Sequence, residues 1–225
     1  MNKSSKLFIY FLIALVFYFI HESAQKHSIP TEPGVEEQYI ADLYEYSDLK
    51  DPEQIELPYD EESIILKGKK YDLALYPQAE YRIYAMVVSK YKYSWGWQSW
   101  ISPFDLALVW NKLMLPEGQK GIMFSQGSRW YYFQYDAQYP FNKEYIETHS
   151  ANNHIIPANK AILNAIKKVH NKERIYMEGY LVDIAGLADN RDVSWNTSLS
   201  RNDTGEGSCE IFYVKRAILN GEIFE

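Results

Sequence analysis

A run of fourteen residues without a charge or a glycine, LFIYFLIALVFYFI at positions 7–20, constrains this chain more than any other feature of its sequence. Lys3 and Lys6 precede the run, and His21 follows it. A positively charged start followed by an apolar stretch of this length is typical of an export signal. We therefore expect the run to form a membrane helix that carries the rest of the chain across a bilayer.

The same run favours an anchor over a cleaved signal. Fourteen helical residues cover about 21 Å, which is short of a hydrocarbon core of about 30 Å, so flanking residues must extend the span at the interface. Ala24 is small enough for the last position before a cleavage site, but Glu22 stands two residues before it. We expect a single-pass signal-anchor with its N-terminus in the cytoplasm and the domain outside, periplasmic or at the cell surface. The alternatives are a cleaved signal, which would make the protein secreted, and a buried core helix.

An acidic stretch follows the apolar run. Between residues 32 and 62 there are twelve acidic side chains and one basic side chain, Lys50, with prolines at 33, 52 and 58. Charge repulsion and few apolar residues favour an extended linker. Tyr39, Ile40, Leu43 and Tyr44 have helical spacing, so a partner-binding segment is the alternative. The expected organisation is a signal-anchor at 1–27, an acidic linker at 28–63 and an aromatic-rich domain at 64–225.

The composition of the chain is that of a folded globular protein, with 47% apolar and 24% charged residues. It excludes a wholly disordered chain, a collagen-like fibre and a polytopic membrane protein. The only cysteine, Cys209, excludes an intramolecular disulfide and a Cys-pair metal site. The alternation around Cys209 predicts a strand with the thiol in its core face.

Two helices are expected within the domain. Ser102-Pro103-Phe104-Asp105 combines a cap residue, a proline and an early acid, and apolar residues at helical spacing follow to position 114. This pattern predicts a buried helix over 102–114. Residues 158–170 have a one-sided apolar stripe with lysines on the other side, which predicts an amphipathic helix.

Strand patterns outnumber these helices. Alternating or β-rich segments cover 81–91, a hairpin at 122–124 and 130–135, and the stretches 174–184, 193–199 and 209–219. Helices do not separate these strands regularly, which disfavours a doubly wound parallel sheet. We therefore expect an α+β domain built on a small curved antiparallel sheet or an OB-like barrel with two helices.

A polar segment at 147–157 is the first candidate site. It holds His149, Asn153 and His154 and leads through Pro157 into the second expected helix. We expect a loop that is either structural, a ligand site or, with Glu147, a metal site or general base. The spacing of the two histidines matches no established ligand pattern, so we predict no metal and no cofactor.

A second polar segment at 195–207 contains Asp203-Thr204-Gly205. An aspartic protease is disfavoured because Arg201 would hold Asp203 ionised, whereas a catalytic pair of aspartates must share a proton. A glycine-rich turn is the structural alternative, and Arg201 with Ser200 could form an anion site. If the two segments meet, His154 is the candidate proton carrier, Arg201 the anion clamp and Asp203 the orienting carboxylate.

The aromatic segment Trp95-Gly96-Trp97 is the third candidate. If it is exposed, Trp95 and Trp97 could hold a sugar or a peptide, or rest at lipid headgroups; if it is buried, it belongs to the core. Nucleic acid is disfavoured because the expected export and the acidic stretch come with no basic stripe to neutralise phosphates. No phosphate-binding loop, dinucleotide fingerprint, serine elbow or zinc helix occurs.

Two functions follow from these features. The first is a membrane-tethered extracytoplasmic module that binds a protein, peptide or glycan partner without catalysis. The second is an exported hydrolase that uses His154, Arg201 and Asp203. The sequence leaves open whether the protein is an enzyme.

Overall fold

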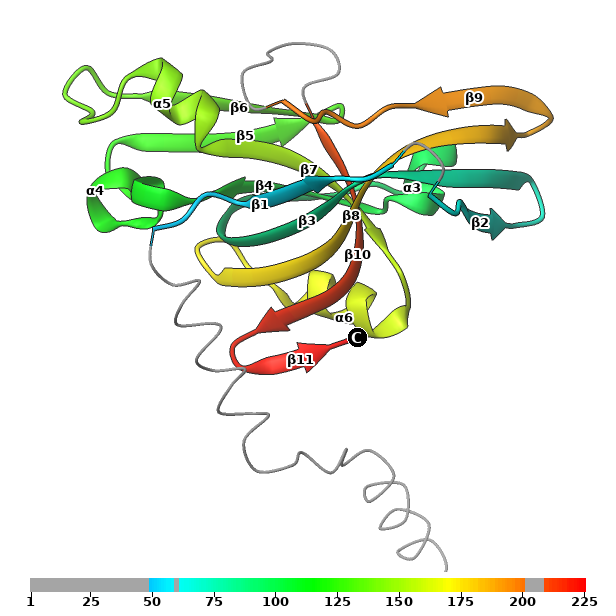
Figure 1. Ribbon diagram of the computed structural model, residues 1–225. Helices are drawn as coiled ribbons and strands as arrows, with labels where there is room; N and C mark the ends of the chain where they lie inside the picture. Colours follow the sequence, from blue (N-terminus) through cyan, green and yellow to red (C-terminus); the bar gives the residue numbers. More distant parts are fainter. Residues whose placement is uncertain (1–48, 59–60, 201–208) are drawn as a thin grey trace, which may run out of the picture. The chain divides into compact units, whose positions relative to one another are not determined.

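The computed structural model describes residues 49–58, 61–200 and 209–225. The predicted membrane helix at 7–20 lies outside this range, as do Arg201 and Asp203. Within the described ranges, no helix combines the length and the apolar character that a bilayer crossing requires. Strands dominate the described chain: nine of them form one strongly curved sheet, and two form a separate hairpin (Figure 1).

Five strands of this sheet close into a ring. They are β3 (Tyr71–Lys92), β4 (Phe104–Val109), β7 (Ser150–Pro157), β8 (Arg174–Ala188) and β10 (Glu210–Leu219). β3 pairs with β4, β4 with β7, β7 with β10, β10 with β8, and β8 again with β3. The β7–β10 pair is parallel, and the other four pairs are antiparallel.

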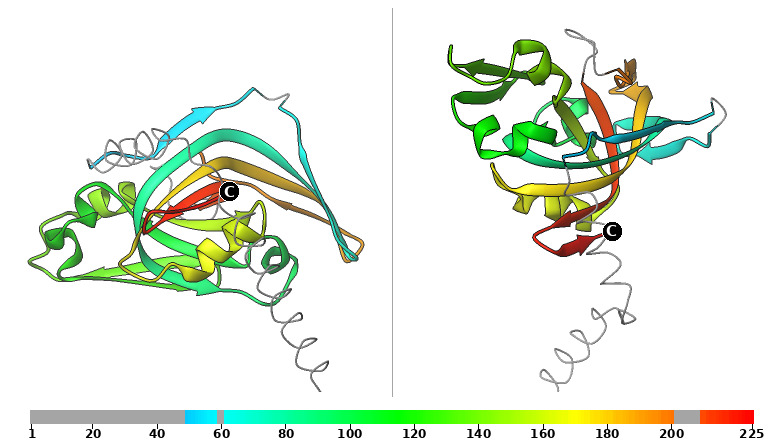
Figure 2. Two further views of the ribbon diagram at one scale, coloured as in Figure 1. Left: turned by 90° about the horizontal axis from the view of Figure 1, so that it is seen from below. Right: turned by 60° about the vertical axis from the view of Figure 1, so that its left-hand side comes forward.

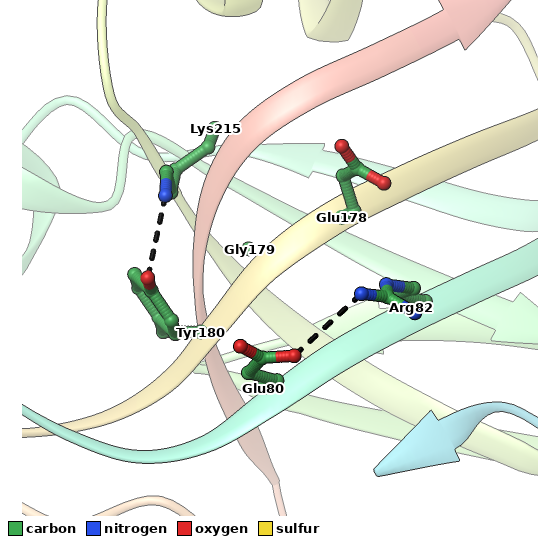
Figure 3. Close-up of a pocket in the computed structure, with 6 residues that line it drawn as sticks. All are labelled: Glu80, Arg82, Glu178, Gly179, Tyr180 and Lys215. Atoms are coloured by element: carbon green, nitrogen blue, oxygen red, sulfur yellow. Dashed lines mark hydrogen bonds and ion pairs between the residues drawn. The ribbon is translucent and has the colours of Figure 1, made fainter. Parts of the chain in front are cut away.

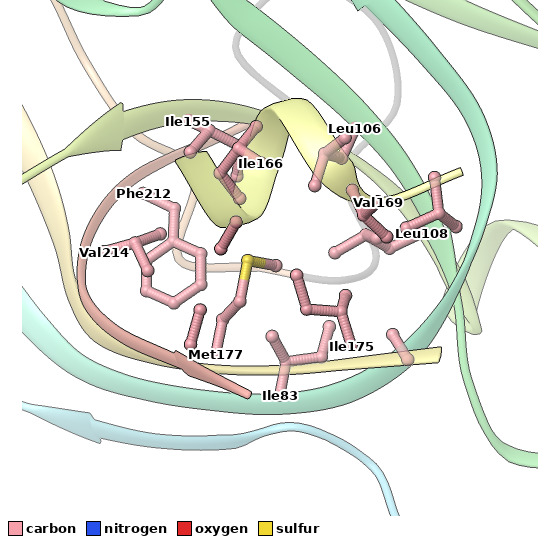
Figure 4. Packing of buried hydrophobic residues seen from close by; sticks show 14 of the residues in the cluster. Ile83, Leu106, Leu108, Ile155, Ile166, Val169, Ile175, Met177, Phe212 and Val214 are labelled. Carbon is pink, nitrogen blue, oxygen red and sulfur yellow. The ribbon is translucent and has the colours of Figure 1, made fainter. Parts of the chain in front are cut away.

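The interior of the ring is an apolar core that helix α6 (Lys160–Lys168) completes (Figure 4). Asn159 caps this helix, because its side-chain oxygen accepts hydrogen bonds from the backbone N–H groups of Ala161 and Ile162. Ile162 and Ile166 lie on the apolar face and are fully buried among the strand side chains. Burial of one continuous stripe therefore fixes the helix against the ring.

Further elements cover the outer surface of the ring (Figure 2). Between β4 and β7 the chain inserts the hairpin of β5 (Ile122–Gly127) and β6 (Trp130–Tyr135), with α5 (Lys143–Thr148) after it. The 3₁₀ turn η1 (Asn111–Met114) and α4 (Pro116–Gln119) lead into this insertion. α3 (Trp97–Ile101) joins β3 to β4, and four short strands extend the sheet: β1 (Glu53–Glu56), β2 (Ile64–Lys67), β9 (Arg191–Trp195) and β11 (Glu222–Phe224).

The structure confirms an α+β domain with a curved, mostly antiparallel sheet. It confirms the helix near 158–170, which is α6, and the hairpin around residues 122–135. The strands expected at 81–91, 174–184 and 209–219 correspond to β3, β8 and β10. These elements were predictable because each shows its periodicity within its own sequence.

The predicted helix over 102–114 is wrong. Phe104–Val109 forms β4, and all six of its residues are buried. Phe104, Leu106 and Leu108 point into the ring core, whereas Val109 joins a different cluster with Ile122 and Ile146. A strand that is covered on both faces loses the alternation of polar and apolar residues, so its sequence resembles a buried helix.

The loop expected over 147–157 is also wrong for most of its length. Residues Ser150–Pro157 form β7, a central strand of the ring, and seven of its eight residues are buried. The polar side chains of this strand suggested a solvated loop. They are instead buried against polar partners that are distant in the sequence, as the next subsection describes.

Part of the acidic stretch belongs to the sheet. Glu53–Glu56, within the range assigned to the linker, forms β1 and pairs with Ala79–Arg82 of β3. Glu53 forms an ion pair with Arg82 at 3.1 Å, and the side chain of Gln54 donates a hydrogen bond to the carbonyl of Leu199. Arg82 on β3 thus pairs with Glu53, one of the acidic residues of the expected linker.

A test of the ring closure is Gly179→Ala in β8. A Cβ at this position would lie 2.0 Å from the carbonyl oxygen of Tyr213 in β10, so the two strands would have to separate. We expect a loss of about 2–3 kcal/mol in the free energy of unfolding, measured by urea denaturation. The control is Gly127→Ala, where a Cβ would meet nothing within 4 Å. Equal stabilities for the two variants would contradict the close β8–β10 contact.

Candidate functional site

The outer face of β4 and β7 carries a buried polar cluster. On β7, Ile155 points into the ring core, so the neighbouring His154 points to the opposite, outer face. In the β4–β7 register His154 lies opposite Asp105. The exposed fraction is 2% for His154 and 0% for Asp105. An acid and an imidazole are therefore held side by side, away from water.

Asp105 is the centre of this cluster. Its Oδ1 atom lies 2.6 Å from Nη1 of Arg129 and 2.9 Å from Nδ1 of His154. The imidazole contact is close in distance, but the ring is not aligned for a hydrogen bond to the carboxylate. Among the described residues, no group forms a hydrogen bond to Oδ2 of Asp105. The carboxylate therefore depends on Arg129 for its neutralisation.

The guanidinium of Arg129 is enclosed by groups from three parts of the chain. Its Nη2 atom donates a hydrogen bond of 2.9 Å to the carbonyl of Ser102, before β4. The Tyr93 ring lies 3.7 Å from the guanidinium carbon, and the Trp195 ring lies 5.5 Å from it. We call Tyr93, Ser102, Asp105 and Trp195 the Arg129 cage. An anion, a carbonyl and two aromatic faces are the groups that best bind a planar cation.

Tyr93 also fixes the backbone of the hairpin tip. Its hydroxyl oxygen accepts a hydrogen bond of 2.9 Å from the N–H of Arg129. Desolvation, reinforced by the negative charge of Asp105, raises the pKa of Tyr93 to about 12. The phenol therefore stays protonated and uncharged at neutral pH. No second negative charge arises beside Asp105 under those conditions.

A layer of polar side chains continues beneath the hairpin tip. Asn152 of β7 donates a hydrogen bond to the carbonyl of Arg129 at 3.0 Å and accepts one from Gln126 of β5 at 2.6 Å. The thiol of Cys209 lies 3.8 Å from the same Arg129 carbonyl. Oε1 of Gln126 is buried and has no hydrogen-bond partner among the described residues. The hairpin tip thus contacts the ring through polar groups.

The first residue of the polar segment 195–207 contacts the polar segment 147–157. The ring of Trp195 contacts the ring of His154 with centroids 4.5 Å apart, and Trp97 packs edge-on against Trp195 at 6.0 Å. The contact joins the segment 147–157 to the described part of the segment 195–207. Arg201 and Asp203 lie outside the described residues, so the predicted meeting of these two residues with His154 stays a prediction.

The two histidines occupy separate surroundings. His149 ends α5, where its ring stacks on Tyr145 with centroids 3.9 Å apart, and its Nε2 atom lies 3.7 Å from a carboxylate oxygen of Asp51. His154 instead contacts Asp105 within the sheet. Within the part of the chain that the structure describes, no group of three or more His, Cys, Asp or Glu side chains could hold a metal ion.

The remaining predicted ligand residues are dispersed. Asn153 is fully buried, and its Nδ2 atom is 3.5 Å from the carbonyl of Ala151. Ser200 is exposed, and its backbone N–H donates to the hydroxyl of Ser198. Trp95 and Trp97 separate at Gly96, whose φ of 85° turns the chain into α3. Trp97 packs against Trp195, whereas 92% of Trp95 is exposed.

A shallow hollow on the outer face of β3, β8 and β10 is a weaker candidate (Figure 3). Its volume of about 120 Å³ is below the roughly 300 Å³ at which small-molecule pockets begin. Arg82 lies 3.6 Å from Glu80 across the hollow, and Lys215 donates a hydrogen bond to the hydroxyl of Tyr180. These charged groups already have partners within the hollow.

Sequence reasoning missed Asp105 and Arg129, the charged pair at the centre of the cluster. Asp105 fitted the first turn of an expected helix, and Arg129 fitted an ordinary hairpin turn. One local signal pointed to Asp105: it is the only charged residue in the apolar run Phe104–Val109. No comparable signal marks Arg129, because the hydrogen-bond partners of its guanidinium are 24 or more residues away.

Comparison of the chain with models of protein families, with curated proteins and with solved structures finds no match. The function must therefore be argued from the residues and their geometry.

The energetic role of the charged pair can be tested by a double-mutant cycle. Arg129→Met should lower the free energy of unfolding by about 3 kcal/mol, because it leaves Asp105 buried without its cation. Adding Asp105→Leu should recover most of this loss. As a control, Arg82→Met breaks a half-exposed pair with Glu53 and should cost at most about 1 kcal/mol. Additive effects at Arg129 and Asp105 would contradict a coupled pair.

Proposed function

We propose that this domain is a non-catalytic binding module built on an OB-like barrel. Numbered along the chain, the ring strands are β3, β4, β7, β8 and β10, and the fifth inserts between the third and the fourth. A five-stranded Greek-key barrel of this kind binds ligands on the face of its second and third strands, beside the loops after the first and the fourth. Here the corresponding face is that of β4 and β7.

The meeting of two connections over this face supports the proposal. The connection between β3 and β4 supplies Tyr93 and Trp97, and the connection between β8 and β10 supplies Trp195. Trp97 packs against Trp195, and the rings of Tyr93 and Trp195 both contact Arg129, which pairs with Asp105. The arrangement puts aromatic side chains from distant parts of the sequence at the place where an OB-like barrel would hold its ligand.

The observation that carries the proposal is the exposure of Trp95. A tryptophan side chain that is 92% exposed leaves a large apolar area in water, which is unfavourable unless a partner covers it. Trp100 and Tyr91 flank the same connection, and each is more than 40% exposed. Exposed aromatic rings stack on sugar rings and pack against peptide side chains. We therefore assign a protein, peptide or glycan partner to this aromatic surface.

A hydrolase is the second candidate, and the contact of His154 with Asp105 is the observation in its favour. Two features make it the weaker candidate: His154 is 2% exposed, and its ring is not aligned with the carboxylate. A general base must reach its substrate within hydrogen-bond distance. Hydrolysis of a bound ligand that is lost in His154→Gln, with binding retained, would favour the hydrolase.

We further propose that the module is tethered outside the membrane. The apolar run at 7–20 and the lysines before it support an uncleaved signal-anchor with the N-terminus in the cytoplasm. The acidic stretch would then serve as the linker between the anchor and the domain. A partner on the outer side of the membrane fits this placement.

The binding proposal predicts that Trp95→Ala weakens ligand binding at least about tenfold, the effect of losing about 1.4 kcal/mol at an aromatic contact. The full-length chain should first be screened against arrays of glycans and of peptides, and the affinity for the best ligand then measured. Tyr76→Ala is the control, because Tyr76 is exposed on β3 and lies outside the aromatic surface. Binding that is unchanged in Trp95→Ala, or no ligand on either array, would refute the proposal.

The tether predicts that the full-length chain stays in the membrane pellet after an alkaline carbonate wash. The double variant Leu12→Asp/Val16→Asp should be released from the pellet, because each charge at the centre of a span raises the free energy of insertion by about 3 kcal/mol. Protease added outside the cell should digest the anchored domain and leave a cytoplasmic tag intact. A wild-type chain found in the cytosolic fraction would contradict the tether.

A further inference from the structure

The hairpin of β5 and β6 is attached differently at its two ends. At its base, Ile122, Phe124 and Phe133 pack in an apolar cluster with Val109 and Ile146. At its tip, the hydrogen bonds and ion pair to the ring are those of Gln126, Arg129 and the Tyr131 hydroxyl. Separating an apolar contact exposes apolar surface to water, and the cost in free energy grows with the area exposed. A hydrogen bond can instead be exchanged for a bond to water or to a ligand. The tip can therefore be displaced at lower cost than the base.

The turn at the tip is conformationally costly. Ser128 and Arg129 have φ values of 52° and 70°, in the left-handed region. Two-residue turns of this kind favour Asn and Gly, which adopt positive φ more easily than arginine does. The contacts of Arg129 in its cage therefore offset an unfavourable backbone conformation. The contacts of the side chain in the cage, and not the conformation of the turn, therefore account for an arginine at this position.

The cage has the composition of a guanidinium-binding site. It offers a carboxylate at 2.6 Å, a backbone carbonyl at 2.9 Å and the face of Tyr93 at 3.7 Å. Asp105 is fully buried, and its Oδ2 atom has no hydrogen-bond partner among the described residues. Arg129 thus uses one oxygen of a carboxylate that could bind a guanidinium through both oxygens. The Oδ2 atom is therefore available to a second N–H group of a guanidinium.

We propose that the Arg129 cage is a binding site for an arginine side chain of a peptide ligand, and that Arg129 occupies it when the ligand is absent. The incoming guanidinium replaces Arg129 on Asp105, and the hairpin tip moves away from β4 and β7. This site adjoins the aromatic surface around Trp95, because the Tyr93 ring of the cage lies 4.8 Å from the Tyr91 ring of that surface, but the two proposals are tested with different probes. Failure of the cage proposal would leave the other standing, and the reverse also holds.

The only cysteine of the chain reports this exchange. The thiol of Cys209 lies beneath the tip, 3.8 Å from the Arg129 carbonyl and 3.7 Å from the Asn152 amide nitrogen. Displacement of the tip removes the Arg129 carbonyl from above the thiol. The rate at which a thiol-reactive dye labels Cys209 therefore measures the position of the hairpin tip.

The experiment measures this labelling rate in the full-length chain with N-acetyl-arginine amide as the probe. The control probe is N-acetyl-citrulline amide, which has the same shape without the charge. We expect the arginine probe to raise the rate saturably, by about fivefold, and the citrulline probe to leave it unchanged. Circular dichroism at the same probe concentrations must show an unchanged fold. Equal effects of the two probes, or acceleration that parallels global unfolding, would overturn the proposal.

A variant removes the internal competitor. Arg129→Ala should bind the arginine probe at least about tenfold more tightly than the wild type, because no side chain must be displaced. Binding of the probe is measured by tryptophan fluorescence. Arg174→Ala, which removes an exposed arginine at the start of β8, is the matched control and should bind as the wild type does. If Arg129→Ala does not fold, Arg129→Gln provides the same comparison with a longer side chain. An affinity equal to that of the wild type in the folded variant would overturn the proposal.

Discussion

The carboxylate of Asp105 has no contact with water, and the arrangement around β4 and β7 follows from the need to neutralise it. Its cation comes from Arg129 at a hairpin tip, which must reach across the outer face of the ring. Tyr93 and Trp195 then enclose that cation on its aromatic faces. One buried charge thus brings together the connection after β3, the connection after β8 and the inserted hairpin.

The ring supplies the rigid support for this cluster. Its interior is filled by apolar side chains, with α6 packed among them, so the strands cannot shift relative to one another without exposing apolar surface. The parallel pairing of β7 with β10 places Glu210 opposite Asn153, and the preceding Cys209 contacts Asn152. The outer face of the ring is therefore polar at its centre, between an apolar cluster around Leu73 and Ile184 and another around Ile122 and Ile146.

Burial on both faces explains which elements the sequence misrepresented. In β4, Leu106 faces the ring core while Ala107 is covered from outside, so every position except Asp105 is apolar and the run suggests a helix. In β7, Asn152 and His154 suggested a loop because isolated polar residues usually face water. Their hydrogen-bond and ion-pair partners lie 23 or more residues away. No local pattern can report a partner at that distance.

The sequence by itself determined the elements whose pattern is local: α6 with its one-sided stripe, the long strands β3, β8 and β10, the hairpin, and the α+β class they make together. It also supplied His154 and Trp97 as residues of interest. Tertiary structure decided the rest: that β4 and β7 are central strands, that Asp105 and Arg129 form the charged pair, and that His154 meets Trp195 while His149 does not. The physical reason is that periodicity is a property of neighbouring residues, whereas the pairing of a buried charge depends on groups that only the folded chain brings together.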